Sequence, residues 1–79
     1  MGDISFLVFG AGAWGTALSL QLNKSGNKVY LSSFDSTNLS GIASTRINQK
    51  YLPGVSLPDE IEVIGLNQEL FKKIDCVVI

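Results

Sequence analysis

Residues 10–15 read Gly-Ala-Gly-Ala-Trp-Gly and directly follow the apolar run Ile-Ser-Phe-Leu-Val-Phe at residues 4–9. This order predicts a strand that passes through a glycine turn into a helix. Gly10 permits the tight turn, Gly12 lets the main chain approach a pyrophosphate closely, and Gly15 lets the helix pack tightly on the strand. The first N–H groups of the helix and its positive dipole end then face the phosphates. We therefore expect this turn to bind a dinucleotide.

The Gly-x-Gly-x-x-Gly pattern alone is a weak signal, because glycine turns also occur in many folds for packing reasons. Its context favours a dinucleotide, since a strand precedes the turn and a helix follows it near the start of the chain. A purely structural turn and a different nucleotide ligand remain as alternatives.

The composition is that of one small globular domain. The chain has 79 residues, of which 46% are hydrophobic and 16% are charged, and its formal net charge is −1. Its basic residues are scattered rather than clustered, so a nucleic-acid partner is not expected. No segment approaches the roughly 20 apolar residues that cross a bilayer, so membrane insertion is not expected either.

The single cysteine, Cys76, lies in an apolar run at the end of the chain. It can form no internal disulfide, and a catalytic thiol would want a histidine, which the chain lacks. We expect Cys76 to be a small buried hydrophobe in a strand. The first residues lack the basic start of a signal peptide, so a cytoplasmic location is the default expectation.

Apolar periodicity and turn residues predict alternating strands and helices. The expected strands cover about 3–9, 28–33, 61–64 and 75–79, and the expected helices about 13–25, 36–49 and 66–73. Residues 51–58 are rich in turn formers and are expected to be a connector. This alternation is typical of an α/β fold with a doubly wound parallel sheet. We predict a partial sheet of about four strands in the order 3-2-1-4.

Two of the expected helices have a predicted buried face. In the helix over 13–25 this face consists of Ala13, Ala17, Leu18, Leu20 and Leu22. In the helix over 66–73 it consists of Leu66, Leu70 and Phe71. The helix over 36–49 is weakened by Gly41 and by several polar residues, and Ser36 is its candidate cap.

The expected fourth strand ends at Ile79, with no loop after it. In doubly wound sheets the functional residues follow the carboxyl ends of the strands. We therefore expect residues 1–79 to be the amino-terminal part of a dinucleotide-binding domain in a longer enzyme. A naturally small module is the alternative.

Further motifs follow the glycine turn in a fixed order. The turn continues as Trp14-Gly-Thr-Ala17, and Arg46-Ile-Asn48, Tyr51-Leu-Pro-Gly54 and Leu57-Pro58 come later. Together they resemble the amino-terminal domain of the NAD(P)-dependent glycerol-3-phosphate dehydrogenases. The resemblance covers the whole chain but only the first part of a typical member. It implies a Rossmann-like fold and hydride transfer between sn-glycerol 3-phosphate and a nicotinamide, with dihydroxyacetone phosphate as the ketone.

The same resemblance implies that much of the machinery lies elsewhere. In this family lysines of the carboxyl-terminal helical domain, and of the loop beyond the fourth strand, handle the alcohol proton. We therefore assign no catalytic residue and expect the chain alone to be inactive. The full-length enzyme would bind a small phosphorylated substrate, form a homodimer, and act in glycerol-3-phosphate metabolism and phospholipid synthesis.

Position by position, the resemblance places Gly10, Gly12, Ala13, Trp14 and Gly15 at the pyrophosphate. Many bacterial members have serine where this chain has Ala13, so one hydroxyl contact is missing while the backbone N–H contacts remain. Trp14 is either a wall packed beside the turn or a residue that shapes the nicotinamide side of the pocket, and the two roles can coexist.

Two residues after the second expected strand bear on the adenosine half. Phe34 offers a ring face that can stack on adenine. Asp35 lies about twenty residues after Gly15, the separation at which an acid hydrogen-bonds the ribose 2′-hydroxyl, and its alternative role is to cap the next helix. An acid there repels a 2′-phosphate, so NAD is favoured. NADP remains possible if Arg46 supplies a partner for that phosphate.

Tyr51 is either an anchor for its own turn or a contact to the adenosine end of the cofactor. The acidic residues show no paired arrangement for acid–base chemistry, and no metal site is expected. Three other functions stay open at this point: a different Rossmann-type dehydrogenase, a flavin-binding domain, and a non-enzymatic nucleotide-binding module.

Overall fold

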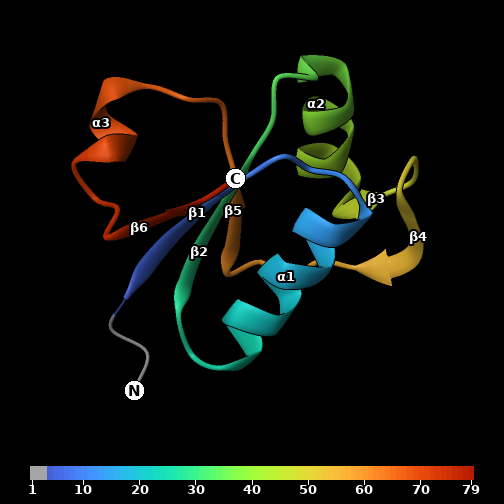
Figure 1. Cartoon of the computed structure of the whole chain (residues 1–79). Helices are drawn as coiled ribbons and strands as arrows, with labels where there is room; N and C mark the ends of the chain where they lie inside the picture. The colour runs from blue at the N-terminus through green and yellow to red at the C-terminus, as the bar shows by residue number, and fades with distance from the viewer. Residues whose placement is uncertain (1–3) are drawn as a thin grey trace.

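Four parallel strands form the main sheet, and two further strands form a separate antiparallel pair (Figure 1). The computed structural model describes residues 4–79. The elements in chain order are β1 (Ser5–Phe9), α1 (Ala13–Lys24), β2 (Lys28–Ser32), α2 (Ser36–Thr45), β3 (Ile47–Asn48), β4 (Leu52–Ser56), β5 (Ile61–Val63), α3 (Gln68–Phe71) and β6 (Cys76–Val78). The order of the main sheet is β5-β2-β1-β6. It confirms the predicted order, because β5 and β6 are the third and fourth expected strands.

β1 lies inside the sheet because it is apolar toward both faces. Leu7 and Val8 are each 1% exposed, and as neighbours in a strand they point to opposite sides. β1 pairs in parallel with β2 on one edge and with β6 on the other. The strand begins at Ser5, and the expected start at residue 3 lies outside the described residues.

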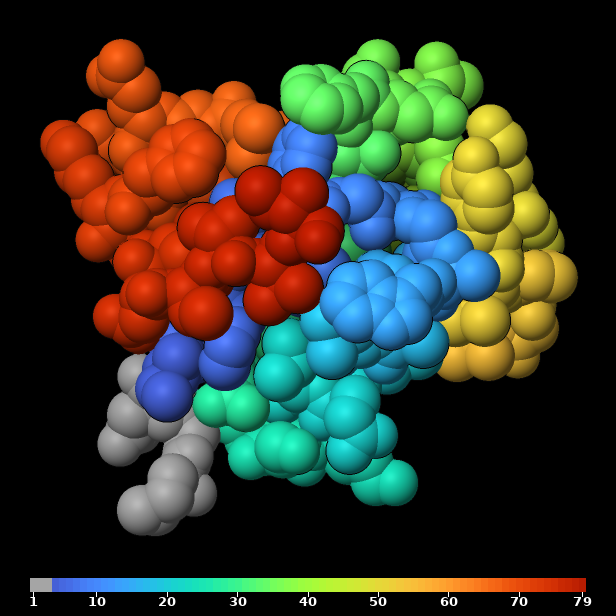
Figure 2. Space-filling model, in the orientation of Figure 1, coloured from blue at the N-terminus to red at the C-terminus, as the bar shows by residue number. Residues whose placement is uncertain are grey.

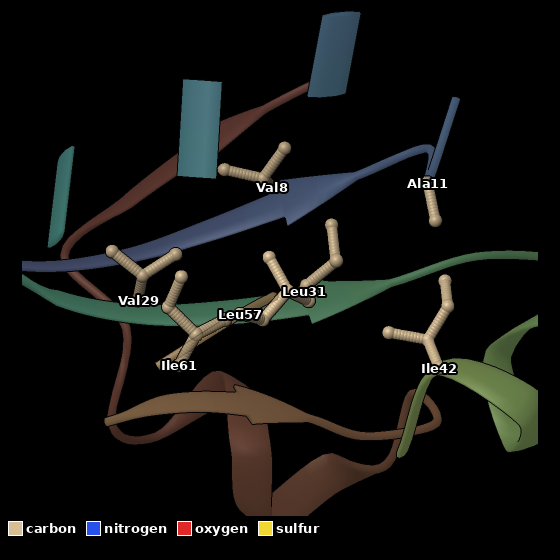
Figure 3. Close-up of a cluster of buried hydrophobic side chains, with 7 residues drawn as sticks. All are labelled: Val8, Ala11, Val29, Leu31, Ile42, Leu57 and Ile61. Atoms are coloured by element: carbon tan, nitrogen blue, oxygen red, sulfur yellow. The ribbon is translucent and has the colours of Figure 1, made fainter. Parts of the chain in front are cut away.

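Hydrophobic side chains cover both faces of the sheet. One cluster, drawn in Figure 3, consists of Val8, Ala11, Val29, Leu31, Ile42, Leu57 and Ile61. The leucines of α1 pack against it. On the other face Leu7 and Tyr30 pack with Leu70 of α3. Parallel sheets need cover on both sides, so the doubly wound α/β class predicted from the sequence is confirmed.

α1 approaches the sheet through small residues. Its buried residues are Gly15, Thr16 and Ser19, and the Ser19 hydroxyl donates to the Gly15 carbonyl at 2.9 Å. The expected apolar face was wrong in part, because Ala13 and Ala17 are exposed and the leucines are only half-buried. The buried side of α1 therefore follows from the close approach that the glycine turn permits, and not from the spacing of its leucines.

Residues 47–56 form a hairpin that the apolar pattern does not predict. β3 and β4 pair antiparallel, so the expectation of a plain connector over 51–58 was wrong for β4. β4 contains Pro53 and Gly54, two residues that are uncommon inside strands. Both are tolerated because β4 has one strand neighbour only, and proline, which has no backbone N–H to donate, is found in strands of this kind.

The last helix and the last strand are shorter than expected. α3 covers residues 68–71; Leu70 is buried as expected, but Leu66 and Phe71 are 44% and 52% exposed. The expected burial of Cys76 was also wrong, because β6 lies at the edge of the sheet and leaves this side chain exposed. Among residues 4–79, no helix is long and apolar enough to cross a membrane.

Candidate functional site

The glycine turn lies at the carboxyl end of β1 and leads directly into α1. Gly10 has a φ of +120°, a conformation that residues other than glycine rarely adopt. Its N–H donates to the carbonyl of Ser32, the last residue of β2, at 2.8 Å. The turn is therefore tied to the carboxyl edge of the sheet, as the sequence predicts for a site of this fold.

Gly15 is required by packing. A Cβ atom at this position would lie 2.0 Å from the carbonyl oxygen of Gly10, far inside any van der Waals contact. The first turn of α1 thus rests directly on the backbone of the strand end. The predicted role of this glycine in close helix–strand packing agrees with the geometry.

Gly12 is required by neither strain nor packing within the described chain. Its φ of −81° and ψ of −171° suit any residue, and a Cβ there would meet no atom within 4 Å. Gly12 is the N-cap of α1, so the open space lies at the start of that helix. A glycine that the protein's own structure does not need fits the predicted close approach of a ligand to the main chain.

The start of α1 is open to an anion. The helix has no side-chain cap and no acidic residue in its first turn. The first i→i−4 hydrogen bond of the helix runs from the Thr16 N–H to the Gly12 carbonyl at 3.0 Å. The N–H groups of Ala13, Trp14 and Gly15 therefore have no acceptor within the helix. The start of α1, light blue, is exposed on the face shown in Figure 2. Free N–H groups and an uncompensated helix dipole are the requirements of a phosphate site.

Trp14 is presented to solvent beside this turn. Its side chain is 66% exposed, so it is not buried in the domain, and both predicted roles of Trp14 stay predictions. Ala13 is exposed as well and offers only its backbone N–H. The geometry thus leaves Trp14 free to border a ligand on the outer side of the turn, and its role toward a nicotinamide stays a prediction.

Phe34 stands just beyond the carboxyl end of β2. It is 88% exposed and touches the ring of Phe9 edge-on, with ring centroids 4.6 Å apart at 83°. The edge contact orients the ring without covering it fully. A flat apolar surface next to the phosphate turn fits the predicted stacking on adenine.

Asp35 caps α2 with one carboxylate oxygen and pairs with Lys50 through the other. The Asn38 N–H donates to Oδ1 at 3.0 Å, and the Lys50 ammonium lies 3.5 Å from Oδ2. The Asn38 N–H, and secondarily Lys50, hold the pKa of this carboxyl below its usual value. Of the two predicted roles the cap is present, in place of the expected cap by Ser36, and the ribose contact stays a prediction.

The side chain of Arg46 is bonded to backbone carbonyls of the same domain. Its φ of 62° ends α2, and its guanidinium donates to the carbonyls of Pro58, at 2.6 Å, and of Ile61 at the start of β5. The interpretation of Arg46 as a partner for a 2′-phosphate was therefore wrong, because its side chain is held by these backbone carbonyls. The same turn explains why α2 stops at Thr45 and does not reach residue 49.

Tyr51 lies between the two strands of the hairpin and is 44% exposed. Its backbone N–H donates to the side-chain oxygen of Asn48 at 3.3 Å, and the Lys50 ammonium lies 5.1 Å from its ring centroid. The turn-anchor role rests on the backbone bond, whereas the ring remains available. Its contact with a cofactor stays a prediction.

Asn48 belongs to the site, but sequence reasoning names it only as part of a motif and assigns it no role. It is fully buried, and its amide nitrogen donates to the Ala11 carbonyl at 2.8 Å and to the Thr16 hydroxyl at 2.9 Å. Both partners belong to the glycine turn or the first turn of α1. Its place in the Arg46-Ile-Asn48 motif is the one signal in the sequence, and this motif does not reveal a partner more than thirty residues away.

One groove borders the candidate site, and the described residues hold no metal centre. Among residues 4–79, no group of three or more histidine, cysteine, aspartate or glutamate side chains is placed to hold a metal ion. A groove of about 390 Å³ runs between α2 and the segment after β3, and Asp35 is the one predicted cofactor residue in its wall. The groove thus reaches the candidate site at Asp35.

Known proteins are similar to this chain in sequence and in fold. The family model for the NAD-dependent glycerol-3-phosphate dehydrogenase N-terminus matches residues 5–79. A glycerol-3-phosphate dehydrogenase [NAD(P)+] of Pelotomaculum thermopropionicum is 48% identical over 66 residues, which are 82% of this chain and 19% of the relative. One from Nitrosomonas eutropha is 36% identical over 76 residues, which are 96% of this chain and 23% of the relative.

A solved structure agrees with the sequence relatives. The crystal structure of glycerol-3-phosphate dehydrogenase from Coxiella burnetii superposes with a TM-score of 0.86 at 28% identity, over 95% of this chain and 23% of that one. The chain thus spans about a fifth of the length of the curated relatives that it matches.

Proposed function

The chain belongs to the NAD-dependent glycerol-3-phosphate dehydrogenase family, whose N-terminal model it matches over residues 5–79, and on that premise we propose that it is the dinucleotide-binding part of such an enzyme. The proposed ligand is a nicotinamide dinucleotide, with its pyrophosphate at the start of α1. Residues 1–79 form the first part of the cofactor domain, and a carboxyl-terminal domain completes the substrate site.

One observation carries the proposal. Gly10 is required by its positive φ, and Gly15 is required by the close packing of α1. Within the described chain, neither backbone conformation nor packing requires Gly12. Its open space lies where the N–H groups of Ala13, Trp14 and Gly15 have no helical acceptor. A turn kept for packing alone would need Gly10 and Gly15 but not Gly12. The third glycine is what a pyrophosphate close to the main chain would require.

The roles of the other residues follow from their positions along the edge. The backbone N–H groups at the start of α1 hold the pyrophosphate, and Phe34 stacks on the adenine ring. Asp35 accepts a hydrogen bond from the ribose 2′-hydroxyl and, through its negative charge, disfavours a 2′-phosphate. With Arg46 bonded to backbone carbonyls, these residues favour NAD over NADP.

The nicotinamide ring, when bound, supplies the acceptor or donor of the hydride. The residues of this chain bind and orient it but move no proton, and we assign no catalytic residue here. The whole protein interconverts sn-glycerol 3-phosphate and dihydroxyacetone phosphate, acts as a homodimer in the cytoplasm, and takes its acid–base groups from outside this chain. The 79 residues alone are inactive.

Titration with NADH, followed by the change in nicotinamide fluorescence, tests the proposal. We expect saturable binding to the 79-residue chain, weaker binding of NADPH, and no NADH production with sn-glycerol 3-phosphate. Binding of FAD in preference to both nicotinamides would favour the flavin alternative instead. Absence of nicotinamide binding to both the chain and the whole protein would contradict the proposed function.

A further inference from the structure

We propose that Asn48 is a positioning residue that, from strand β3, holds the glycine turn in the shape that binds the ligand. The proposal rests on the proposed dinucleotide site and adds a residue that contacts no ligand itself. It predicts that cofactor affinity depends on a side chain of the β3–β4 hairpin, a segment outside the strand–turn–helix unit that forms the site.

The two donor bonds of Asn48 end on either side of Gly12. One goes to the carbonyl of Ala11, in the middle of the turn, at 2.8 Å. The other goes to the hydroxyl of Thr16, in the first turn of α1, at 2.9 Å. One rigid amide group thereby fixes the angle between the turn and the helix, and this angle decides where the free N–H groups point.

The acceptor side of Asn48 ties the same amide to the rest of the domain. Its oxygen accepts from the backbone N–H of Tyr51 at 3.3 Å and from the side chain of Asn38, in α2, at 3.4 Å. With two donor and two acceptor bonds, the amide uses both of its N–H groups and both lone-pair directions. Asn48 is fully buried, so its own orientation is fixed by packing as well as by these bonds.

The turn is therefore held from two sides. On the strand side, the contact between Gly15 and the Gly10 carbonyl sets how close the helix lies. On the hairpin side, Asn48 satisfies the carbonyl of Ala11, a residue that is 4% exposed. Without Asn48 this carbonyl loses its side-chain partner, and the turn gains freedom to rotate toward another donor. A site that must be ordered by its ligand binds that ligand more weakly than one already in place.

Four variants separate positioning from stability. Asn48→Ala removes the amide, and Thr16→Val removes one of its acceptors with little change in shape. Thr16→Ser keeps the hydroxyl that Thr16→Val lacks. Leu70→Ala is the matched control, because Leu70 is 2% exposed in the cluster on the other face of the sheet and its loss lowers stability without touching the turn.

Two quantities are measured: NADH affinity and the amide hydrogen exchange of residues 10–16. Both are measured at a temperature at which circular dichroism shows every variant to be folded. We expect Asn48→Ala to weaken NADH binding at least tenfold and to speed exchange of the turn amides, with a smaller effect of Thr16→Val that Thr16→Ser largely restores. Leu70→Ala should leave NADH affinity within twofold of wild type.

Binding by Asn48→Ala within twofold of wild type, with unchanged exchange at the turn, would overturn the inference. An equal loss of affinity in Leu70→Ala would do so too, because the effect would then be one of general stability. If neither the wild-type chain nor the whole protein binds NADH, the proposed function fails separately. Exchange at the turn then decides alone, since faster exchange in Asn48→Ala supports the positioning role and unchanged exchange overturns it.

Discussion

Two strand-to-helix turns lie at the same edge of the sheet and end in opposite ways. The turn from β1 into α1 has Gly12 as its N-cap, without a side-chain acceptor and without an acid in the first helical turn. The turn from β2 into α2 has Asp35 as its N-cap, and the carboxylate accepts the Asn38 N–H at 3.0 Å. One helix start is closed by the protein's own anion, and the other is left open.

The difference between the two helix starts indicates which group of a ligand each of them suits. An open helix start with free N–H groups attracts an anion, whereas a start already occupied by a carboxylate repels one. The pyrophosphate is therefore expected at α1 and an uncharged hydroxyl at α2. On the proposed function, the same contrast predicts that this edge prefers a ribose 2′-hydroxyl to a 2′-phosphate.

The largest expected effect is a loss of stability when a side chain is placed between α1 and the end of β1. A Cβ in Gly15→Ala would lie 2.0 Å from the Gly10 carbonyl oxygen, so the helix or the turn must move. Overpacking of this kind costs about 3 kcal/mol, which in a domain of this size lowers the melting temperature by more than roughly 10 °C. Thermal unfolding followed by circular dichroism measures the change.

Gly41→Ala is the matched control for that experiment. Gly41 lies inside α2, and a Cβ there would meet no atom within 4 Å. Alanine is the better helix former by about 1 kcal/mol, so this variant should melt at a higher temperature than wild type. Equal melting temperatures for Gly15→Ala and wild type would mean that the contact between α1 and the turn does not constrain the fold.

The next largest effect is a loss of NADH affinity when the start of α1 is given a carboxylate cap like that of α2. Gly12→Asp places a carboxylate at the N-cap of α1, where the backbone angles suit it and a Cβ meets no neighbour within 4 Å. The cap should raise stability by a few tenths of a kcal/mol at about neutral pH. Because the new charge faces the pyrophosphate, NADH affinity should fall about 100-fold.

Gly12→Asn separates charge from shape in this comparison. Asparagine caps a helix about as well as aspartate and has nearly the same size, but it carries no charge. NADH titrations should therefore rank wild type above Gly12→Asn and Gly12→Asn above Gly12→Asp. Equal affinities of the two variants would show that steric exclusion, not the open anion site, accounts for the effect.

The sequence predicts the local parts of this edge and not the distant ones. Gly10 and Gly15 could be predicted because each role depends on neighbours a few residues away, whereas the role of Gly12 toward a ligand stays a prediction. The four-strand order followed from the alternation of apolar strands with helices, together with the family resemblance. Asn48 could not be read, because its importance lies in hydrogen bonds to residues 11 and 16, which only the folded chain brings close.

Alternatives that the sequence left open were decided by competing local contacts. Asp35 and Ser36 are both good caps, and the helix starts so that the aspartate takes that role. Arg46 carries the charge that a 2′-phosphate would want, yet two backbone carbonyls hold it. The hairpin was missed because Pro53 and Gly54 are typical of turns, and only the pairing of β3 with β4 makes that segment a strand.

The smallest expected effect concerns the charge that closes the second turn. Asp35→Asn keeps an oxygen that can cap α2 but removes the attraction to Lys50, whose ammonium lies 3.5 Å away on the surface. The native pKa of Asp35 is held below 3.8, first by the Asn38 N–H and then by Lys50. The ionised carboxylate therefore stabilises the native state above about pH 4, and this contribution is lost as the pH falls through the lowered native pKa.

Melting temperatures at pH 7 and pH 3 check this sign. Wild type should melt slightly above Asp35→Asn at pH 7, and the gap should shrink at pH 3 and also in high salt, because both charges are exposed. In parallel, the ratio of NADPH to NADH affinity should rise in Asp35→Asn, since the charge that opposes a 2′-phosphate is gone. A gap in melting temperature that widens toward pH 3 would contradict the lowered pKa. An unchanged affinity ratio would remove Asp35 from the ribose site and leave it only as the cap of α2.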